Sequence, residues 1–375
     1  MGLVQVSIFD GSQRFFIKNP IRLIELFAGY GSQALALKYL GVPFEHWRIS
    51  EWAYKSIQAY KDLHFGGDDT DYSEGRTIDE VTDFLFSRSI SANYNTPLTR
   101  KQISHYSEKV RRTIYNNMKA TRNLGSICNI TADDLGIVES DKYTYIMTYS
   151  FPCQDLSSAG NGLGMEKGSG TRSSLLWEVD RLLSECKELP QVLVMENVPE
   201  VVGTKNMPHF AKWLARLEGL GYRSKWQVLN ATDFNVPQNR ERCFMVSMLG
   251  DYFYDFPQPI GCELRLKDVL EKNVDEKYYL KEGAIVALAE HKARNKAKGN
   301  GFGWKPIDPN GGGTSQERLR PKATIAPTAT LFSKHHKQAD GILLGKSKEF
   351  TKPPLKDLSR TILTDGSNGV VEWKK

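Results

Sequence analysis

Short apolar runs alternate with amphipathic stretches along the chain between residues 20 and 250. The apolar runs are rich in β-branched and aromatic residues, which is typical of buried strands. The runs are IRLIELFAG, HWRISEW, KYTYIMTYS, QVLVMENV, SKWQVLNA and RCFMVSML. Stretches such as SQALALKYLG, SSLLWEVDRLLSECKEL and HFAKWLARLEGLG space their leucines and aromatic residues three or four apart, which predicts helices. This alternation predicts an α/β fold with a mostly parallel sheet and helices on both faces.

The alternation fades after residue 256, where the segment FPQP marks a break. Residues 257–375 are rich in glycine, proline and lysine, so they predict a smaller, irregular, β-rich domain of loops and short strands. A basic tail without a fold is the alternative for this region. We expect a first domain over residues 1–256, with an insertion at about residues 66–125 that is helical in its second half.

Composition limits the class of protein. Apolar residues make up 40% of the 375 residues, which is enough for a packed core and argues against a disordered chain. No apolar run reaches the ~18 residues that a membrane helix needs, so we expect a cytoplasmic protein with no membrane partner. The five cysteines are widely spaced without a C-x-x-C pattern, which predicts free thiols and no metal site.

Basic residues gather in one stretch of a chain whose formal net charge is +6. Residues 99–122 contain seven lysines and arginines against one glutamate. Such a stretch can bind a polyanion. It can equally form the solvated face of a helix, and the sequence alone does not separate these two interpretations.

The segment FAGYGS, residues 27–32, follows the first predicted strand and precedes the first helix. Gly29 and Gly31 let the backbone approach a ligand, although ordinary strand-to-helix turns also contain this pattern. Glu51 lies twenty residues beyond Gly31, where a carboxylate can accept both ribose hydroxyls, and Trp52 can stack on an adenine. Because no third glycine is present for a pyrophosphate, these residues favour a nucleoside cofactor without phosphates, such as S-adenosylmethionine.

Cys153 follows the run KYTYIMTYS in the segment FPCQ, so we expect it at the carboxyl end of a strand. Nucleophiles are held at this edge of α/β sheets, and a thiol with an ordinary pKa of about 8.5 is partly ionised at neutral pH. A small buried hydrophobic residue is the alternative role. The run QVLVMENV ends in Glu196 and Asn197, so a carboxylate can share the crevice with Cys153 and act as an acid.

A further polar motif, VPQNRERCFMV, leads into the last predicted strand. Gln238, Arg240 and Arg242 occupy alternate positions, which predicts that both arginines point to one side. Two guanidinium groups can hold a phosphate and a carbonyl oxygen. Each of these residues can also form a structural ion pair, but their order along successive strand ends indicates a common site.

These motifs, in their order and spacing, resemble those of the cytosine-5 DNA methyltransferases over roughly residues 20–250. The resemblance implies a Rossmann-like S-adenosylmethionine-dependent methyltransferase fold, with target recognition in the smaller domain. The expected cofactor contacts are Phe27, Gly29, Gly31, Glu51, Trp52, Ser126, Pro152 and Leu175. The expected catalytic residues are Cys153, Glu196, Arg240 and Arg242, and the expected substrate contacts are Gln154, Ser157, Asn197 and Gln238.

The resemblance also implies a mechanism. Carbon 5 of cytosine is too poor a nucleophile to attack a sulfonium methyl group unaided, so Cys153 would first add to carbon 6. Glu196 would bind ring N3 and the exocyclic amine, while the two arginines surround the base and its phosphate. The cytosine would be flipped out of the duplex, and the glycine- and serine-rich loop 154–172 would close over it.

The chain departs from the family pattern in two places. Ser126 stands where the family usually has an aspartate near the adenine amine, so we expect weaker cofactor binding at most. The final segment, SRTILTDGSNGVVEWKK, lacks the Gly-Asn-x-Val helix that completes the family's cofactor pocket. We therefore expect one half of a split enzyme, completed by a small second subunit, or a truncated product.

Three hypotheses follow for the function. The first is a DNA cytosine-5 methyltransferase of a bacterial or phage modification system, acting on specific sites in double-stranded DNA. A tRNA cytosine-5 methyltransferase is the alternative within the same chemistry, since one such type shares the Pro-Cys-Gln motif. The alternative from another class is a DNA-binding remnant with an incomplete, inactive pocket.

Overall fold

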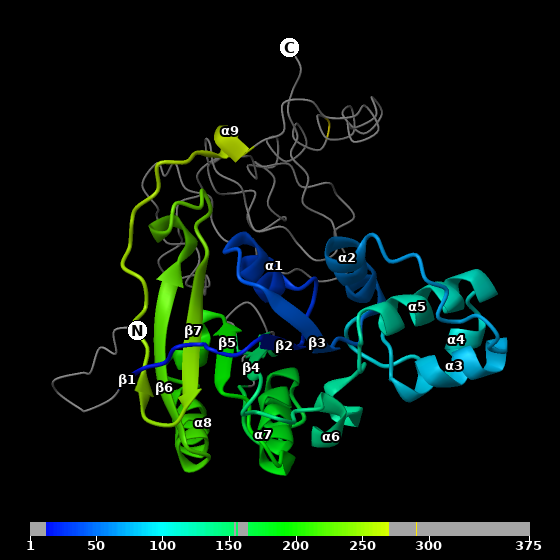
Figure 1. The fold of residues 1–375 in the computed structure, drawn as a ribbon. Helices are drawn as coiled ribbons and strands as arrows, with labels where there is room; N and C mark the ends of the chain where they lie inside the picture. The colour runs from blue at the N-terminus through cyan, green and yellow to red at the C-terminus, as the bar shows by residue number, and fades with distance from the viewer. Residues whose placement is uncertain (1–12, 154, 157–163, 270–289, 291–375) are drawn as a thin grey trace. The chain divides into compact units, whose positions relative to one another are not determined.

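A computed structural model of the protein describes residues 13–153, 155–156, 164–269 and 290 (Figure 1). The chain divides into two compact units. One comprises Met1–Gln227 and Cys243–Phe256, and the other comprises Val228–Arg242 and Pro257–Lys375. Most of the region in which we expect target recognition, residues 270–289 and 291–375, lies outside the described residues.

A six-stranded sheet forms the centre of the fold, with strand order β3-β2-β4-β5-β7-β6 (Figure 1). Strand β2 pairs in parallel with β3 and β4, and β4 pairs in parallel with β5, whereas β7 runs antiparallel to β5. The predicted mostly parallel sheet is therefore confirmed. The bounds are β2 Ile21–Leu26, β3 Phe44–Ser50, β4 Thr144–Tyr149, β5 Val192–Asn197, β6 Tyr222–Asn230 and β7 Glu241–Leu249.

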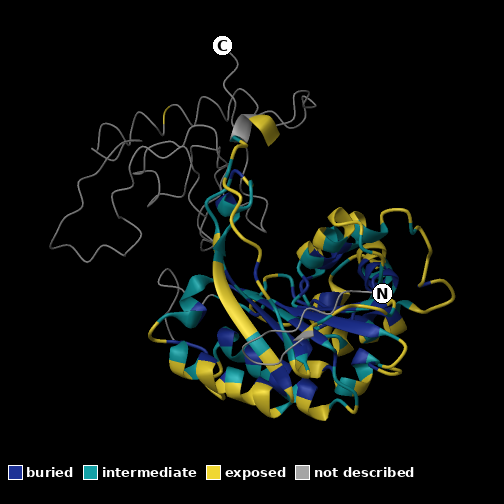
Figure 2. Cartoon of the chain, turned by 60° about the vertical axis from the view of Figure 1, so that its left-hand side comes forward, coloured by how far each residue is buried: buried dark blue, intermediate teal, exposed yellow. Residues whose placement is uncertain are grey.

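Helices cover both faces of this sheet, as predicted. Helices α1 and α2 lie against one face, and α7 and α8 lie against the other (Figure 1). Their bounds are α1 Ser32–Tyr39, α2 Tyr54–Phe65, α7 Leu176–Glu185 and α8 Met207–Gly219. The central strands between these layers are largely buried, and all six residues of β4 are buried, whereas β6 is mostly exposed (Figure 2). Parallel strands covered on both sides read as continuous apolar runs, which explains why the sequence predicted them.

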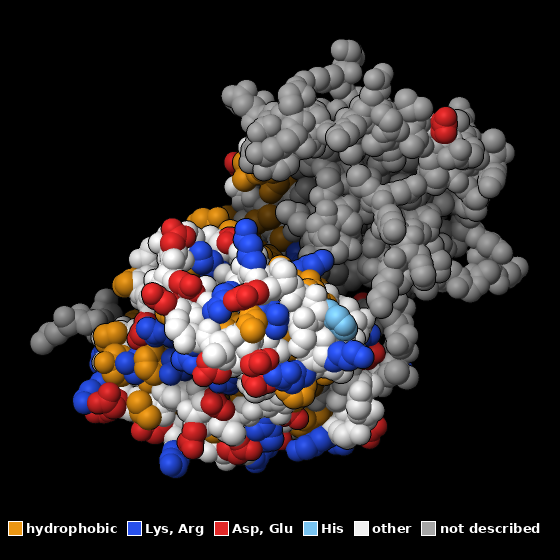
Figure 3. All heavy atoms as spheres, turned by 90° about the vertical axis from the view of Figure 1, so that its right-hand side faces the viewer, with side chains coloured by type: hydrophobic (Ala, Val, Ile, Leu, Met, Phe, Trp, Pro, Cys, Tyr) orange, Lys and Arg blue, Asp and Glu red, His pale blue; other side chains and the backbone are white. Residues whose placement is uncertain are grey.

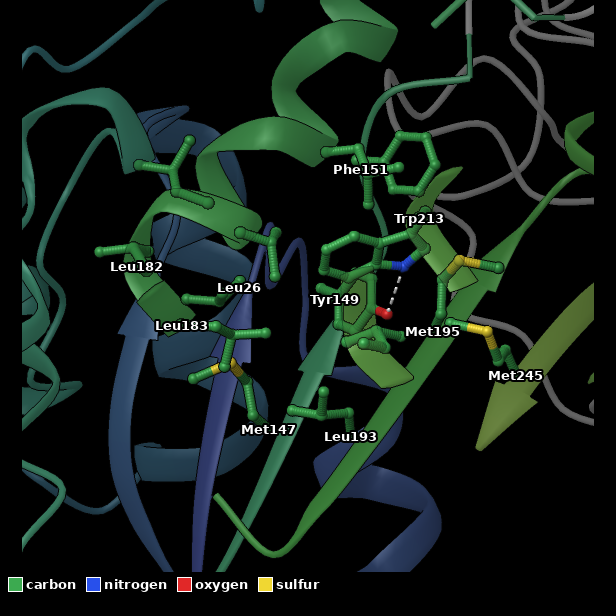
Figure 4. Packing of buried hydrophobic residues seen from close by; sticks show 14 of the residues in the cluster. Leu26, Met147, Tyr149, Phe151, Leu182, Leu183, Leu193, Met195, Trp213 and Met245 are labelled. Atoms are coloured by element: carbon green, nitrogen blue, oxygen red, sulfur yellow. Dashed lines mark hydrogen bonds between the residues drawn. The ribbon is translucent and has the colours of Figure 1, made fainter. Parts of the chain in front are cut away.

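The larger hydrophobic core lies between the sheet and the layer formed by α7 and α8 (Figure 4). Trp213 of α8 is fully buried, and its indole Nε1 donates a hydrogen bond of 3.1 Å to the hydroxyl of Tyr149 at the end of β4. The phenol oxygen thus provides the acceptor that the buried indole N–H needs. This contact fixes the end of β4 against α8, directly before the segment that contains Cys153.

Residues 66–125, which we expect to be an insertion, contain helices with a hydrophobic core of their own. Helices α3, Ile78–Ser87, α4, Arg100–Ser104, and α5, Glu108–Ala120, pack with α2 around a cluster of buried side chains. Thr77 and Thr99 begin α3 and α4 with reciprocal capping bonds to Glu80 and Gln102. The predicted helices in the second half of the insertion are confirmed, and α3 is an additional helix in the first half.

Most basic side chains of residues 99–122 have partners inside the protein. Arg100 pairs with Asp79 and Asp83, and Arg122 pairs with Glu45. Arg111, Arg112 and Lys119 contact Thr82, Glu108 and the ring of Phe84, respectively. Lys, Arg, Asp and Glu are interspersed on the face of the molecule that Figure 3 shows. The structure therefore favours the second interpretation of this stretch, a solvated helical surface with internal ion pairs.

The remaining elements are short. They are β1 Gln13–Arg14, α6 Ala132–Leu135, β8 Tyr252–Phe253, α9 Leu266–Val269, and the 3₁₀ helices η1 Ile127–Asn129, η2 Arg172–Leu175, η3 Pro199–Val202 and η4 Ala231–Asp233. None of the described helices is both long and apolar enough to cross a membrane. The same residues contain no group of three or more His, Cys, Asp or Glu side chains placed to hold a metal ion.

Candidate active site

The segment FAGYGS forms the turn between β2 and α1. Phe27, Gly29 and Gly31 all have left-handed backbones, with φ of 57°, 56° and 80°. A Cβ atom added to Gly29 would meet no heavy atom within 4 Å, so this glycine borders open space. The turn therefore exposes backbone where a ligand can approach closely. Phe27 packs against the larger core, which anchors the start of the turn.

Glu51 follows β3 and holds the glycine turn from one side. Its carboxylate accepts hydrogen bonds from the backbone N–H of Gly29 at 2.9 Å and of Ala53 at 2.7 Å. Burial raises the pKa of Glu51 to about 7, although the backbone hydrogen bonds oppose this shift. The backbone N–H of Trp52 is a third donor to this carboxylate, and the remaining lone-pair capacity can accept a hydroxyl donor from a ribose. Trp52 is half-buried beside it.

Ser126 lies in a segment that is bound to the end of β3. The side chain of Asn123 accepts from the backbone N–H of Glu51 at 3.2 Å and donates to the Glu51 carbonyl at 3.0 Å. Ser50 Oγ donates to the carbonyl of Gly125 at 2.8 Å. The structure thus brings Ser126, which is half-buried, to the same edge of the sheet as Glu51.

Cys153 lies in a turn that follows β4, as its place in the sequence predicts. The turn is closed by a hydrogen bond of 3.0 Å from Leu156 N to the Cys153 carbonyl. The buried carboxylate of Asp155 accepts from the backbone N–H of Arg172 at 2.7 Å. Ser173 Oγ donates to the carbonyl of Pro152 at 2.7 Å, so η2 supports the turn on both sides of Cys153.

Glu196 and Asn197 end the neighbouring parallel strand β5 and bind the segment before Cys153. Ser150 Oγ donates a short hydrogen bond to Glu196 Oε2. Asn197, which is buried, donates from Nδ2 to the carbonyl of Phe151 at 3.0 Å. Because β4 and β5 are adjacent and parallel, these bonds bring the cysteine segment and the glutamate to one edge of the sheet.

The second unit carries the arginine motif. Asn230 Oδ1 accepts from the backbone N–H of Arg240 at 3.1 Å, and Asn230 Nδ2 donates to Asn239 Oδ1 at 2.7 Å. Arg240 precedes β7, whereas Arg242 lies in the strand and donates to the carbonyl of Glu241 at 2.7 Å. Gln238 lies in the preceding turn, where its N–H donates to the Val236 carbonyl. The common orientation of the two arginines stays a prediction.

Three other residues were predicted to belong to the site. Leu175 ends η2, is half-buried and packs against the larger core. Gln154 and Ser157 lie outside the described residues, as do residues 158–163 of the loop predicted to close over the base.

Several residues that support the site were not predicted from the sequence. Ser150 directly follows a strand, which was a usable signal because polar residues at such positions face the ligand crevice. Asn123 and Asp155 had no such signal. Their roles depend on backbone groups of Glu51 and of η2 that are distant in the sequence.

The sheet, its helical layers and the polar strand ends define an α/β fold of the Rossmann-like methyltransferase class. Residues 101–363 match the family of C-5 cytosine-specific DNA methylases. The type II methyltransferase M2.ScrFI of Lactococcus lactis subsp. cremoris is 39% identical over 271 residues, covering 71% of each chain. The orphan methyltransferase M.SssI of Spiroplasma monobiae is 36% identical over 285 residues, covering 75% of this chain and 72% of its own.

The chain belongs to the C-5 cytosine-specific DNA methylase family. Its enzyme class is accordingly that of the DNA (cytosine-5-)-methyltransferases.

Proposed function

We propose that the protein methylates carbon 5 of cytosine at specific sites in double-stranded DNA, as the modification enzyme of a bacterial or phage system, through a covalent bond to Cys153. One arrangement carries this proposal. The hydrogen bonds from Ser150 to Glu196 and from Asn197 to Phe151 join the cysteine segment to the glutamate at neighbouring strand ends. A nucleophile and an acid held at one edge can act on the same ring.

The chemistry of cytosine requires both groups. The Cys153 thiolate forms a bond to carbon 6, and the electron pair of the carbon 5–carbon 6 double bond moves into the ring toward N3. Glu196 donates a proton to N3 and accepts a hydrogen bond from the exocyclic amine, which stabilises this enamine. After carbon 5 has taken a methyl group, a base removes the carbon-5 proton, the carbon 5–carbon 6 double bond forms again, and the thiolate leaves carbon 6. N3 returns its proton to Glu196.

The cofactor that we propose is S-adenosylmethionine, which supplies a methyl group activated as a sulfonium. The residues present fit its nucleoside part. Glu51 offers carboxylate lone pairs for the ribose hydroxyls, Gly29 borders open space, and the ring of Trp52 is available for stacking on the adenine. Phe27, Ser126, Pro152 and Leu175 remain proposed contacts of this cofactor.

Changing Glu51 to alanine is expected to weaken cofactor binding by about 10- to 100-fold, because a charge-assisted pair of hydroxyl contacts is lost. Isothermal titration calorimetry with S-adenosylmethionine measures this directly. Since the pKa of Glu51 is about 7 and hydroxyl donors favour the carboxylate, affinity should be lower at pH 6 than at pH 8.

Glu51→Gln provides the control for this prediction, because it keeps the shape of the side chain but does not titrate. Its affinity should lack the rise between pH 6 and pH 8. An unchanged dissociation constant in Glu51→Ala would contradict the role of this carboxylate.

The substrate cytosine is inaccessible inside a duplex, so we propose that it is flipped out of the stack into this site. Arg240 and Arg242 are the proposed contacts of the base and its phosphate, with Gln154, Ser157, Asn197 and Gln238 as further substrate contacts.

Transfer of tritiated methyl groups from S-adenosylmethionine tests the proposed function. The purified full chain is incubated with unmethylated duplex DNA or with tRNA, and bisulfite sequencing then locates the modified cytosines. We expect label in duplex DNA at a defined site. If only tRNA is labelled, the protein methylates RNA and the proposal of DNA methylation is wrong.

A further inference from the structure

Side chains of helix α2 pack against the glycine turn, FAGYGS. Gly31 has a left-handed backbone with φ of 80°, and a Cβ atom added there would lie 2.5 Å from Cε2 of Tyr60 and clash with His64 Nε2. The two rings therefore press directly against the backbone of the turn. Glu51 binds the same turn at Gly29.

Hydrogen bonds fix the orientation of the His64 ring. Lys38 Nζ lies 3.1 Å from His64 Nδ1, and because an ammonium group only donates, Nδ1 must accept. The proton of the neutral ring is then on Nε2, which donates to the carbonyl of Tyr30 at 2.9 Å. His64 therefore holds the turn one residue before Gly31 and links it to α1.

Tyr60 is fixed by a buried network that crosses the fold. Its hydroxyl donates to Glu25 Oε2 at 2.5 Å and lies 2.9 Å from His46 Nδ1. The other carboxyl oxygen of Glu25 accepts from the backbone N–H of Ala34 in α1 at 3.2 Å. Tyr60 is fully buried, so its ring supports the turn without being accessible to a ligand.

We propose that His64 and Tyr60 are positioning residues for the cofactor, which hold the glycine turn in the shape that binds S-adenosylmethionine. This inference rests on the proposed function of the site. Two of the three left-handed residues of the turn are glycines, which lose more backbone entropy than other residues when they are fixed, and a rigid support reduces the ordering required when the cofactor binds. Loss of the support should therefore weaken binding without changing the chemical step.

The test compares His64→Ala with His64→Gln. In His64→Ala, we expect the dissociation constants of S-adenosylmethionine and S-adenosylhomocysteine to rise about tenfold by calorimetry. The KM for the cofactor should rise in parallel, while kcat at saturating cofactor stays within about twofold. A glutamine can still accept from Lys38 and donate to Tyr30, so His64→Gln should recover most of the affinity. His105→Ala, an exposed histidine at the end of α4, is the matched control and should bind as the unaltered chain does.

The results distinguish a failure of the proposed function from a failure of the positioning role of His64. If the unaltered chain does not bind S-adenosylmethionine, the proposed function fails. If the unaltered chain binds and His64→Ala binds equally well, the positioning role is wrong. Tyr60→Phe keeps the ring and removes the bond to Glu25, and we expect a smaller loss of affinity at an unchanged kcat. If His64→Ala and His64→Gln lose affinity to the same degree, or if His64→Ala does not fold by circular dichroism, the residue has an architectural role only and the proposal is overturned.

Discussion

Replacing Cys153 by serine should lower methyl transfer by more than about a thousandfold, because a serine hydroxyl is scarcely ionised at neutral pH and cannot add to carbon 6. The side chain changes by a single atom, and the turn around it is held by backbone groups of Leu156 and Pro152. The fold and the affinities for cofactor and DNA should therefore be preserved. The initial rate of tritium transfer measures the loss, and calorimetry and gel shifts measure binding.

Cys186→Ser is the matched control for this experiment. Cys186 is a half-buried cysteine that directly follows α7 in the same unit, and its replacement should leave the rate unchanged. A Cys153→Ser protein that retained substantial activity would exclude the covalent route. A denaturation-resistant complex with DNA containing 5-fluorocytosine, formed by the unaltered chain and not by Cys153→Ser, would give independent support.

Replacing Glu196 by glutamine should lower kcat by about 100-fold or more, since the amide can neither protonate ring N3 nor carry the negative charge of a carboxylate. The two side chains have nearly the same shape, and a glutamine oxygen can still accept the hydrogen bond from Ser150. The KM for the cofactor should change little. Initial rates at saturating S-adenosylmethionine, measured over a range of pH, test this prediction.

Glu200→Gln in η3 is the control, since it makes the same change of charge four residues further along the chain. Its rate should match that of the unaltered chain. If Glu196→Gln has the same rate and pH profile as the unaltered chain, the carboxylate has no part in the chemical step.

The central sheet could be predicted because strands that are buried on both faces appear in the sequence as continuous apolar runs. Strand β4 is buried at every residue, and its run of apolar side chains has no other plausible location. The places of Cys153 beyond the end of β4 and of Glu196 near the end of β5 followed from the same logic, since ligands bind at the carboxyl ends of parallel strands. Short elements such as β1 and β8 have two residues each, too few to form a pattern.

The supports of the site could not be predicted in this way. Asn123 binds both backbone groups of Glu51, and Tyr60 bonds to Glu25, yet each pair is far apart in the sequence. Helix periodicity would assign Tyr60 to the core, but it gives no information about the partner of its hydroxyl. Similarly, the basic composition of residues 99–122 is visible in the sequence, whereas the acidic partners of Arg100 and Arg122 lie in other segments.

The internal pairing of Arg100, Arg112 and Arg122 affects how the protein should respond to ionic strength. Charges that are already neutralised by neighbouring carboxylates displace few condensed counterions when a nucleic acid approaches. The slope of log affinity against log salt concentration should therefore be set by cationic groups elsewhere in the chain. Added salt would mainly screen these ion pairs. It should therefore lower the melting temperature of helices α3 to α5.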